Sequence, residues 1–141
     1  MKSMLIVIAS LFLFVPDDTN KKYCLTVKLL NIKSQNGVIE IGLYKDPEKF
    51  PKVGQSHGMV RVKPNGSELV YHFVNLEPAP YAVCIYHDEN SNKVCDKNLI
   101  GIPTEAYAFS NNFRPKWSAP EFEDCSFDLD KDRIVSIKMV Y

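Results

Sequence analysis

The sequence lacks an excess of charge of either sign. Its 141 residues include 17 Lys and Arg and 17 Asp and Glu, which gives a formal net charge of zero. Proteins that bind nucleic acid carry a basic face, and this composition indicates none. An acidic tail is absent as well. The charge pattern therefore predicts that nucleic acid is not a partner.

Long apolar runs are also missing. The longest runs from Met4 to Val15 behind Lys2, and it is broken only by Ser10. A membrane-spanning helix needs about 20 apolar residues, whereas about a dozen behind a basic residue is typical of a secretory signal. We therefore interpret residues 1–20 as a signal peptide and residues 21–141 as one exported domain, periplasmic or extracellular, without a transmembrane span. Because Val15-Pro16-Asp17 lacks the small residues of a usual cleavage site, a buried strand or a short anchor stays open.

The motifs of common enzymes are missing too. The chain contains no G-x-S-x-G, no H-E-x-x-H and no glycine-rich phosphate loop. Cys84 and His87 lie three residues apart on one expected strand, so their side chains point to opposite faces. This excludes a local Cys–His pair. Whether the chain is an enzyme stays uncertain, with a non-catalytic role favoured.

Cysteine is scarce but even in number. All four cysteines follow the apolar run: Cys24, Cys84, Cys95 and Cys125. Their spacing does not match a zinc site, whereas an exported chain favours disulfides. Four cysteines allow three connectivities. We favour Cys24–Cys84, which would tie two expected strands, and Cys95–Cys125, which would tie the long loop to the following strand.

Alternation of apolar and polar residues predicts β-strands through most of the remaining chain. The turn sequences Asn36-Gly37 and Pro64-Asn65-Gly66 predict tight hairpins, and Pro78-Ala79-Pro80 predicts a turn. No segment has the pattern of an amphipathic helix. We therefore predict an all-β, antiparallel two-sheet sandwich, Ig-like or transthyretin-like, with about seven strands and one long irregular loop at 88–120. The expected strands are residues 23–31, 38–45, 58–63, 68–76, 81–87, 123–129 and 133–140.

Oxygen-bearing side chains recur at steps of two after the fifth expected strand. This spacing is typical of a loop that wraps Ca²⁺. The candidate ligands are Asp88, Asn90, Asn92, Val94 through its carbonyl, Asp96 and Glu105. Lys93 stands where an EF-hand loop has Gly, and Leu99 where it has Glu, so we expect weak binding, with Kd on the order of 10⁻⁴ to 10⁻³ M. The alternative is a loop whose Asp and Asn side chains accept their own backbone amides, with no ion.

Aromatic side chains follow this loop. Tyr107, Phe109 and Trp117 are candidates for a platform that binds a protein, peptide or glycan. The other interpretation is a lid over one end of the sandwich, because a long irregular segment needs apolar anchors to stay ordered.

Three stretches together carry a resemblance to a known family. They are H-D-E-N-S-N at 87–92, G-I-P-T-E-A-Y-A-F-S-N at 101–111 and P-E-F-E-D-C-S-F at 120–127. The chain resembles domain-of-unknown-function family 2141, small exported bacterial proteins, over most of residues 23–140. The resemblance implies a β-sandwich in which a strand ends in the Asp/Asn loop, and it implies no activity. Relatives tend to have glycines in that loop, where this chain has Ser91 and Lys93, so we expect Asn90 or Asn92 to make the left-handed turn.

Two functions follow as hypotheses. The first is a non-catalytic binding or structural module whose Asp/Asn loop, with or without Ca²⁺, presents residues 97–120 to a partner. The alternative is a small metal-assisted hydrolase that uses Asp88, Asp96 and Glu105. A third possibility is an accessory sandwich that acts only through its interfaces.

Overall fold

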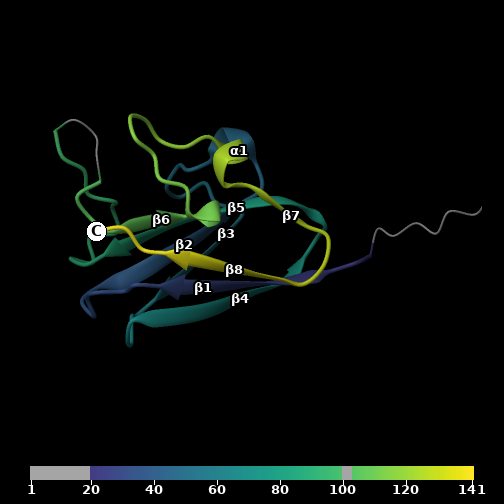
Figure 1. The fold of residues 1–141 in the computed structure, drawn as a ribbon, viewed down its shortest axis with the longest axis horizontal. Helices are drawn as coiled ribbons and strands as arrows, with labels where there is room; N and C mark the ends of the chain where they lie inside the picture. The colour runs from purple at the N-terminus through teal and green to yellow at the C-terminus, as the bar shows by residue number, and fades with distance from the viewer. Residues whose placement is uncertain (1–19, 100–102) are drawn as a thin grey trace, which may run out of the picture.

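Two β-sheets pack face to face in the computed structural model, which describes residues 20–99 and 103–141 (Figure 1). The three-stranded sheet has the order β4-β1-β8, with β1 at Tyr23–Leu30, β4 at Glu68–Leu76 and β8 at Arg133–Lys138. The larger sheet has the order β3-β2-β5-β6, and β7 pairs with the start of β5. Its strands are β2 (Val38–Tyr44), β3 (Gly58–Val62), β5 (Ala79–Asp88), β6 (Tyr107–Phe109) and β7 (Phe127–Leu129). The prediction of an all-β sandwich is confirmed, with eight strands in the described residues.

One strand pair departs from the antiparallel prediction. β1 and β8 run parallel, from Leu25 opposite Arg133 to Leu30 opposite Lys138, whereas every other pair of named strands is antiparallel. A parallel pair needs a long crossover connection. Here the connection is nearly the whole domain, because β1 is the first strand and β8 the last.

Both predicted hairpins are wrong. Asn36-Gly37 connects β1 to β2, and Pro64-Asn65-Gly66 connects β3 to β4, so each turn joins strands of different sheets. The Gln35 side chain links the two connections, since it donates to Gly66 O at 3.0 Å and accepts from Gly66 N at 2.7 Å. The turn residues did reverse the chain, but they carry no information about which sheet receives the next strand.

Three helical segments occupy two of the connections, β2–β3 and β6–β7. They are the 3-10 turns η1 (Pro47–Lys49) and η2 (Ser110–Asn112) and the short helix α1 (Phe122–Cys125). α1 replaces the first half of the strand expected at 123–129. A capping box explains this, because Glu121 accepts from the backbone of Asp124 while Asp124 Oδ2 accepts from Glu121 N at 3.0 Å. The expected turn at Pro78-Ala79-Pro80 is also displaced, since Ala79 and Pro80 already pair with β7.

The apolar residues form two clusters rather than one. The main cluster lies between the sheets and includes Leu25, Val27 and Leu29 from β1. The second lies on the other face of the five-stranded sheet and consists of Tyr44, Phe50, Ala82, Phe109, Phe122 and Cys125. Phe50 is at its centre, with ring centroids 5.3 Å from Tyr44, 6.1 Å from Phe109 and 5.9 Å from Phe122. The five-stranded sheet is therefore covered on both faces.

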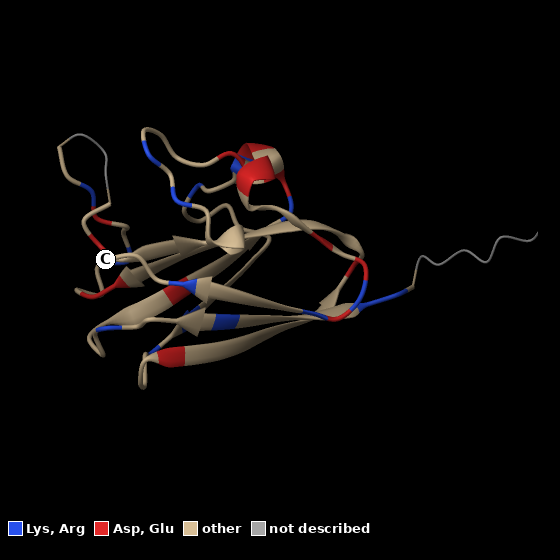
Figure 2. Cartoon of the chain, viewed as in Figure 1, with Lys and Arg blue, Asp and Glu red and all other residues tan. Residues whose placement is uncertain are grey.

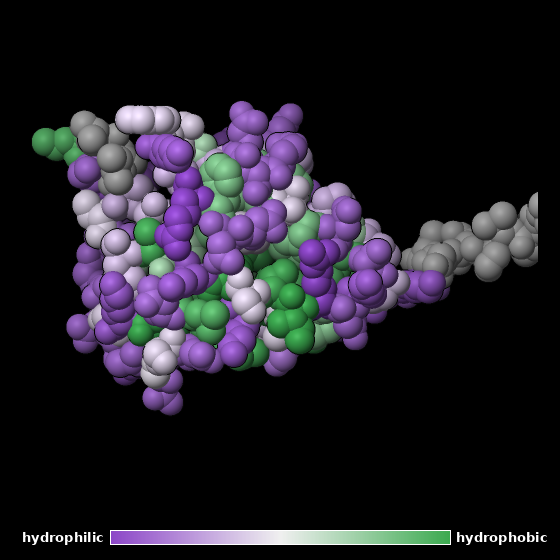
Figure 3. Space-filling view, viewed as in Figure 1, coloured by the Kyte–Doolittle hydropathy of each residue, from purple (hydrophilic) through white to green (hydrophobic). Residues whose placement is uncertain are grey.

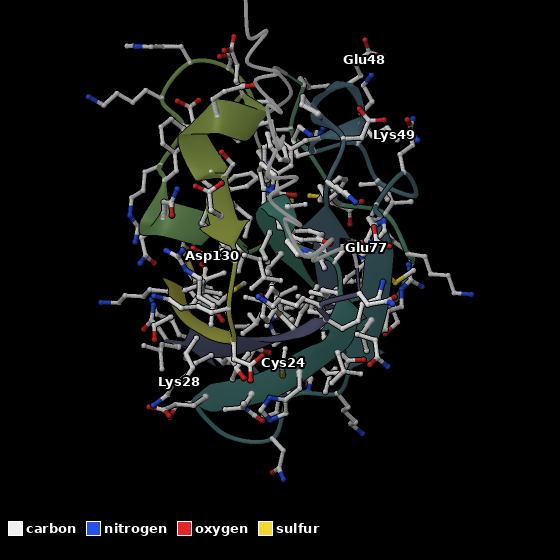
Figure 4. All side chains as sticks on the ribbon, turned by 90° about the vertical axis from the view of Figure 1, so that its right-hand side faces the viewer. Cys24, Lys28, Glu48, Lys49, Glu77 and Asp130 are labelled. Atoms are coloured by element: carbon white, nitrogen blue, oxygen red, sulfur yellow. The ribbon has the colours of Figure 1, made fainter. Side chains whose placement is uncertain are left out.

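The cysteines do not form the predicted bridges, because all four are free. Cys24 projects from the three-stranded sheet next to the inward-facing Leu25, so it lies on the outer face of that sheet (Figure 4). Cys84 packs against the second cluster, beyond the five-stranded sheet. Both sheets thus separate this pair. Cys125 is buried in the second cluster, and burial raises the pKa of its thiol to about 12.

Two further sequence predictions concern a signal peptide and a membrane span. The interpretation of residues 1–20 as a signal peptide falls, except for Asn20, outside the described residues. Across residues 20–99 and 103–141, we find no helix of sufficient length and apolarity for a membrane span.

Candidate functional site

Asp88 closes the end of β5 and organises the loop that follows. Its side chain is 1% exposed. Oδ1 accepts from Asn92 N at 3.0 Å, and Oδ2 accepts from Lys93 N at 2.8 Å. These bonds are those of an Asx-type turn, in which a carboxylate satisfies amides a few residues further on. The carboxylate therefore already has donors for both oxygens.

The other Asp and Asn side chains converge on one another. Asn90 Oδ1 accepts from Asn92 N at 2.9 Å, and Asn92 Oδ1 accepts from Val94 N at 2.8 Å. The amide nitrogens of Asn90 and Asn92 donate to the Asp96 carboxylate, at 2.6 Å and at 3.0 and 3.1 Å respectively. The side-chain oxygens thus point at backbone amides, and the side-chain nitrogens point at the second carboxylate.

Glu105 joins the far end of the segment to this loop. It accepts from Glu89 N at 3.2 Å and from Asp96 N at 3.1 Å. Burial, followed by the nearby Asp96 and Asp88 charges, raises the pKa of Glu105 above its ordinary value, although the two amide bonds oppose the shift. The structure therefore brings Asp88, Asp96 and Glu105 into one hydrogen-bonded unit.

Calcium binding by this loop stays a prediction. Across the described residues, no group of three or more His, Cys, Asp or Glu side chains is arranged to hold a metal ion. To ligate Ca²⁺, Asn90 and Asn92 would have to turn their carbonyl oxygens away from the backbone amides that they now accept. The geometry therefore agrees better with the alternative of a loop that satisfies its own amides.

The left-handed residues of the loop are not those expected. Ser91 has φ 59° and Lys93 has φ 67°, whereas Asn90 and Asn92 are not in this region. The asparagines instead use their side chains to accept amides two residues ahead, and the residue after each takes the positive φ. These two positions are where relatives were expected to have glycine.

A cleft lies on the outer face of the five-stranded sheet, beside the second cluster. Its volume is about 430 Å³. β5 and β6 contribute Cys84, Tyr86, Tyr107 and Phe109, which lie on the outer face, and residues 115–120 form one wall. The other lining residues are Pro51, Val53, Ile85, Cys95, Lys97 and Pro103. The cleft is thus mainly apolar.

The three candidate platform residues all line this cleft. Tyr107 and Phe109 lie two apart on β6, with ring centroids 5.8 Å apart. Trp117 is 97% exposed, so it does not anchor its segment. Phe113 does, since it packs against the second cluster. The segment at 113–117 therefore covers the second cluster at Phe113 and leaves the aromatic ring of Trp117 exposed beside the cleft.

The family comparison gives a match over most of the chain. The description "Uncharacterized protein conserved in bacteria (DUF2141)" fits residues 27–137. This chain belongs to the DUF2141 family. No curated protein and no solved structure gives a match. Since the family description names no activity, the function of this DUF2141 protein has to be argued from its geometry.

The F-S-N motif of this DUF2141 chain has a structural role that the sequence did not reveal. β6 ends at Phe109 opposite Cys84, and β7 begins at Phe127 opposite Tyr81, which leaves a gap along the edge of β5. Buried Ser110 fills it, because Oγ accepts from Val83 N at 2.8 Å and donates to Cys125 O at 2.6 Å. Asn111, the last residue of the motif, donates to Asp124 O at 3.3 Å and to Ser126 O at 2.9 Å. The next residue, Asn112, bonds the edge of β8, donating to Ser136 O at 3.1 Å and accepting from Lys138 N at 2.8 Å.

A partly buried ion pair beside the cleft was also missed. Glu40 is 6% exposed and faces Arg61, whose Nε and Nη2 lie 2.7 and 2.6 Å from Oε2. The Tyr86 hydroxyl donates to the same oxygen at 3.0 Å. Glu40 holds the pKa of Arg61 above its ordinary value through this hydrogen bond and its charge. The only sequence signal was a carboxylate within the apolar strand V-I-E-I-G-L-Y.

His87 and Cys84 of this DUF2141 chain do lie on opposite faces of β5, as predicted. Cys84 is in the cleft, whereas His87 is fully buried on the face of Val83 and Ile85 toward the main cluster. His87 Nε2 lies 2.7 Å from Asn36 O, and Nδ1 has no hydrogen-bond partner. The buried ring therefore braces the β1–β2 connection and contributes nothing to the cleft.

Proposed function

We propose that the protein is an exported, non-catalytic binding module that holds its ligand in the cleft against Trp117. The support is the placement of Trp117, whose nearly fully exposed ring lines the cleft together with Tyr107 and Phe109. An exposed large aromatic ring at a concave apolar surface is typical of a recognition site, since contact with a ligand removes it from water. Among the residues described, no other large hydrophobic side chain of the cleft is as exposed as Trp117.

The metal-assisted hydrolase has weaker support. Its candidate carboxylates, Asp88, Asp96 and Glu105, are not among the lining residues of the cleft. Each already accepts hydrogen bonds from within the loop segment. A general base needs a free lone pair that reaches the substrate, directly or through one water. The loop instead serves the proposed module as a rigid support for Cys95 and Lys97, which do line the cleft.

The test uses the neutral fluorophore N-phenyl-1-naphthylamine and the full chain labelled for NMR. Trp117 is the one tryptophan in the sequence, so its emission reports directly on the cleft. We expect the probe to quench Trp117 and to shift amide signals of residues 84–86, 107–109 and 115–120.

The matched variants are Trp117→Ala and Leu99→Ala. Both remove a fully exposed apolar side chain, but Leu99 does not line the cleft. We expect Trp117→Ala to weaken binding at least fivefold and Leu99→Ala to leave it unchanged, because one base-sized stacking contact contributes about 1–3 kcal/mol. Shifts that map instead to β1, β4 and β8, or equal effects of the two variants, contradict the proposal.

A further inference from the structure

We propose that the cleft selects a small amphipathic anion, a molecule with an apolar ring system and one carboxylate, sulfonate or similar group. This inference rests on the proposed function, because it names the class of ligand for the same cleft. Three features of the lining carry it: the sign of its charges, the position of Lys97, and the scarcity of free hydrogen-bonding groups.

All charge in the cleft is of one sign. Lys97 and Lys116 are the only charged residues that line it in the described part of the chain. Within the described residues, neither ammonium forms an ion pair with a carboxylate. Near residues 115–120, acidic residues lie on α1, to the right of this segment in Figure 2. The cavity of about 370 Å³ on that side is lined by both signs, with Arg114 and Lys116 beside Glu121 and Asp124. Of these two cavities, only the cleft is lined by positive charge alone.

Lys97 lines the cleft together with Cys84 and Cys95. Its charge opposes the increase that burial and carboxylates outside the cleft cause in the pKa of both thiols. Lys97 is held at this place by its backbone, which forms a β-bridge with Pro103. Lys116 stands on the opposite wall, next to Trp117. A ligand stacked on the indole would therefore have a cation on each side.

The remaining lining favours an apolar body over a sugar. A glycan needs several convergent donors and acceptors, because each buried hydroxyl without a partner is costly. The Tyr86 hydroxyl already donates to Glu40, and Pro51, Pro103, Pro115 and Pro120 present no backbone N–H. The volume, about 430 Å³, lies in the range of small-molecule pockets. Two or three aromatic rings and one anionic group match this surface.

The experiment compares two probes with the same skeleton. 8-Anilinonaphthalene-1-sulfonate carries a sulfonate that N-phenyl-1-naphthylamine lacks. Both are titrated into the full chain at low and moderate salt, and quenching of Trp117 is followed together with probe emission. We expect the sulfonate to bind roughly three- to tenfold more tightly than the neutral probe, and this advantage to shrink as salt rises.

Variants that remove lysine charges then test whether the tighter binding of the sulfonate probe depends on Lys97 and Lys116. Lys97→Met/Lys116→Met removes both cleft charges, and Lys63→Met/Lys131→Met removes two exposed charges outside the cleft. We expect the first pair to reduce the affinity of the sulfonate to that of the neutral probe, without weakening the neutral probe, and the second pair to change neither.

Failure of the inference and failure of the proposed function have different signatures. Equal affinities for the two probes, with Trp117→Ala weakening both, overturn the anion preference and leave the binding cleft. An equal loss in the two lysine pairs also overturns it, because it reflects net charge alone. If Trp117→Ala weakens the binding of neither probe, the proposed binding function of the cleft is wrong, and the inference about its ligand is wrong with it.

Discussion

The two outer faces of the sandwich differ in what covers them. On the three-stranded sheet, Val70, Val74 and Ile134 are 52%, 60% and 71% exposed. Figure 3 shows such apolar side chains among polar ones on the face over β1 and β8. On the five-stranded sheet, Phe50 and Phe122 instead bury the outer face beneath the connections of the chain.

The burial patterns along β1 and β5 reflect this difference between the two sheets. β1 alternates strictly between buried and partly exposed residues, as expected for a sheet with one face toward the core. β5 contains Tyr81, Ala82, Val83, Ile85 and Tyr86, all buried, which is typical of a strand covered on both faces. The lesson is that the proposed site lies where a second apolar layer is incomplete, not on the face that is simply open.

The largest expected effect contrasts the two faces directly. Phe50→Ala should reduce the free energy of unfolding by about 3–5 kcal/mol, because it removes a buried ring that touches three other aromatic residues. Val74→Ala on the open face should change it by no more than about 0.5 kcal/mol. Urea denaturation measures both. Similar losses would show that the second cluster contributes little to stability.

The next largest effect on the free energy of unfolding is expected at Gly37, which lies close to the backbone of Asp88. Gly37 has φ 64°, and a Cβ there would lie 1.9 Å from Asp88 O. Gly54 also has positive φ, 77°, but a Cβ there would meet nothing within 4 Å. We expect Gly37→Ala to cost about 2–4 kcal/mol and Gly54→Ala about 1 kcal/mol, since only the first adds a backbone clash to the left-handed strain. Equal denaturation midpoints would contradict the packing of Gly37 on the loop.

Substitutions of Ser110 and Thr26 compare a buried hydrogen bond on the five-stranded sheet with an exposed one on the three-stranded sheet. Ser110→Ala leaves Val83 N and Cys125 O without their partner in a buried place, so we expect a loss of about 1–3 kcal/mol. Thr26→Val removes an exposed bond on the open face, Thr26 Oγ1 to His72 Nδ1 at 2.9 Å, and should cost about 0.5 kcal/mol or less. Hydrogen exchange at Val83 checks the mechanism, because its amide should lose protection only in the first variant.

Lys93 provides a smaller effect of opposite sign. Lys93→Gly should stabilise the chain by about 0.5 kcal/mol, because the relief of a left-handed φ exceeds the entropy that glycine loses on folding. Asn75 has φ 59°, and Asn75→Gly should bring no gain, since asparagine tolerates this region. Thermal unfolding distinguishes them. A loss of stability in Lys93→Gly would mean that the loop does not hold the conformation described.

The smallest expected effect is that of calcium. If the loop bound Ca²⁺ with Kd near 10⁻⁴ to 10⁻³ M, about 5 mM would add roughly 1–2 kcal/mol and several degrees to Tm. Because the asparagine oxygens already accept backbone amides, we expect a change below about one degree. A gain of several degrees that Asp88→Ala abolishes, while Asp130→Ala at an exposed turn retains it, would establish the ion site instead.

Much of the fold could be predicted because strands leave a local signature. The bounds of β4 agree with the predicted range, and those of β1, β2, β3 and β5 agree within about two residues. The capping box at Glu121 and Asp124 was equally local, yet it was overlooked because the alternation of Cys125, Phe127 and Leu129 also fits a strand. The cleft was predicted only as a set of aromatic residues, since its other wall comes from Lys97 and Pro103 across the loop.

The sequence by itself determined most of the segments that are extended, most of the residues that turn the chain, and the clustering of Asp and Asn side chains at residues 88–96. Each of these depends on neighbours a few residues away. Only the tertiary structure decided that Asn36-Gly37 crosses between sheets, that Cys24 and Cys84 lie on opposite outer faces, and that Tyr107 and Trp117 share a cleft. These outcomes depend on how the whole chain buries its apolar area, and no local pattern specifies that.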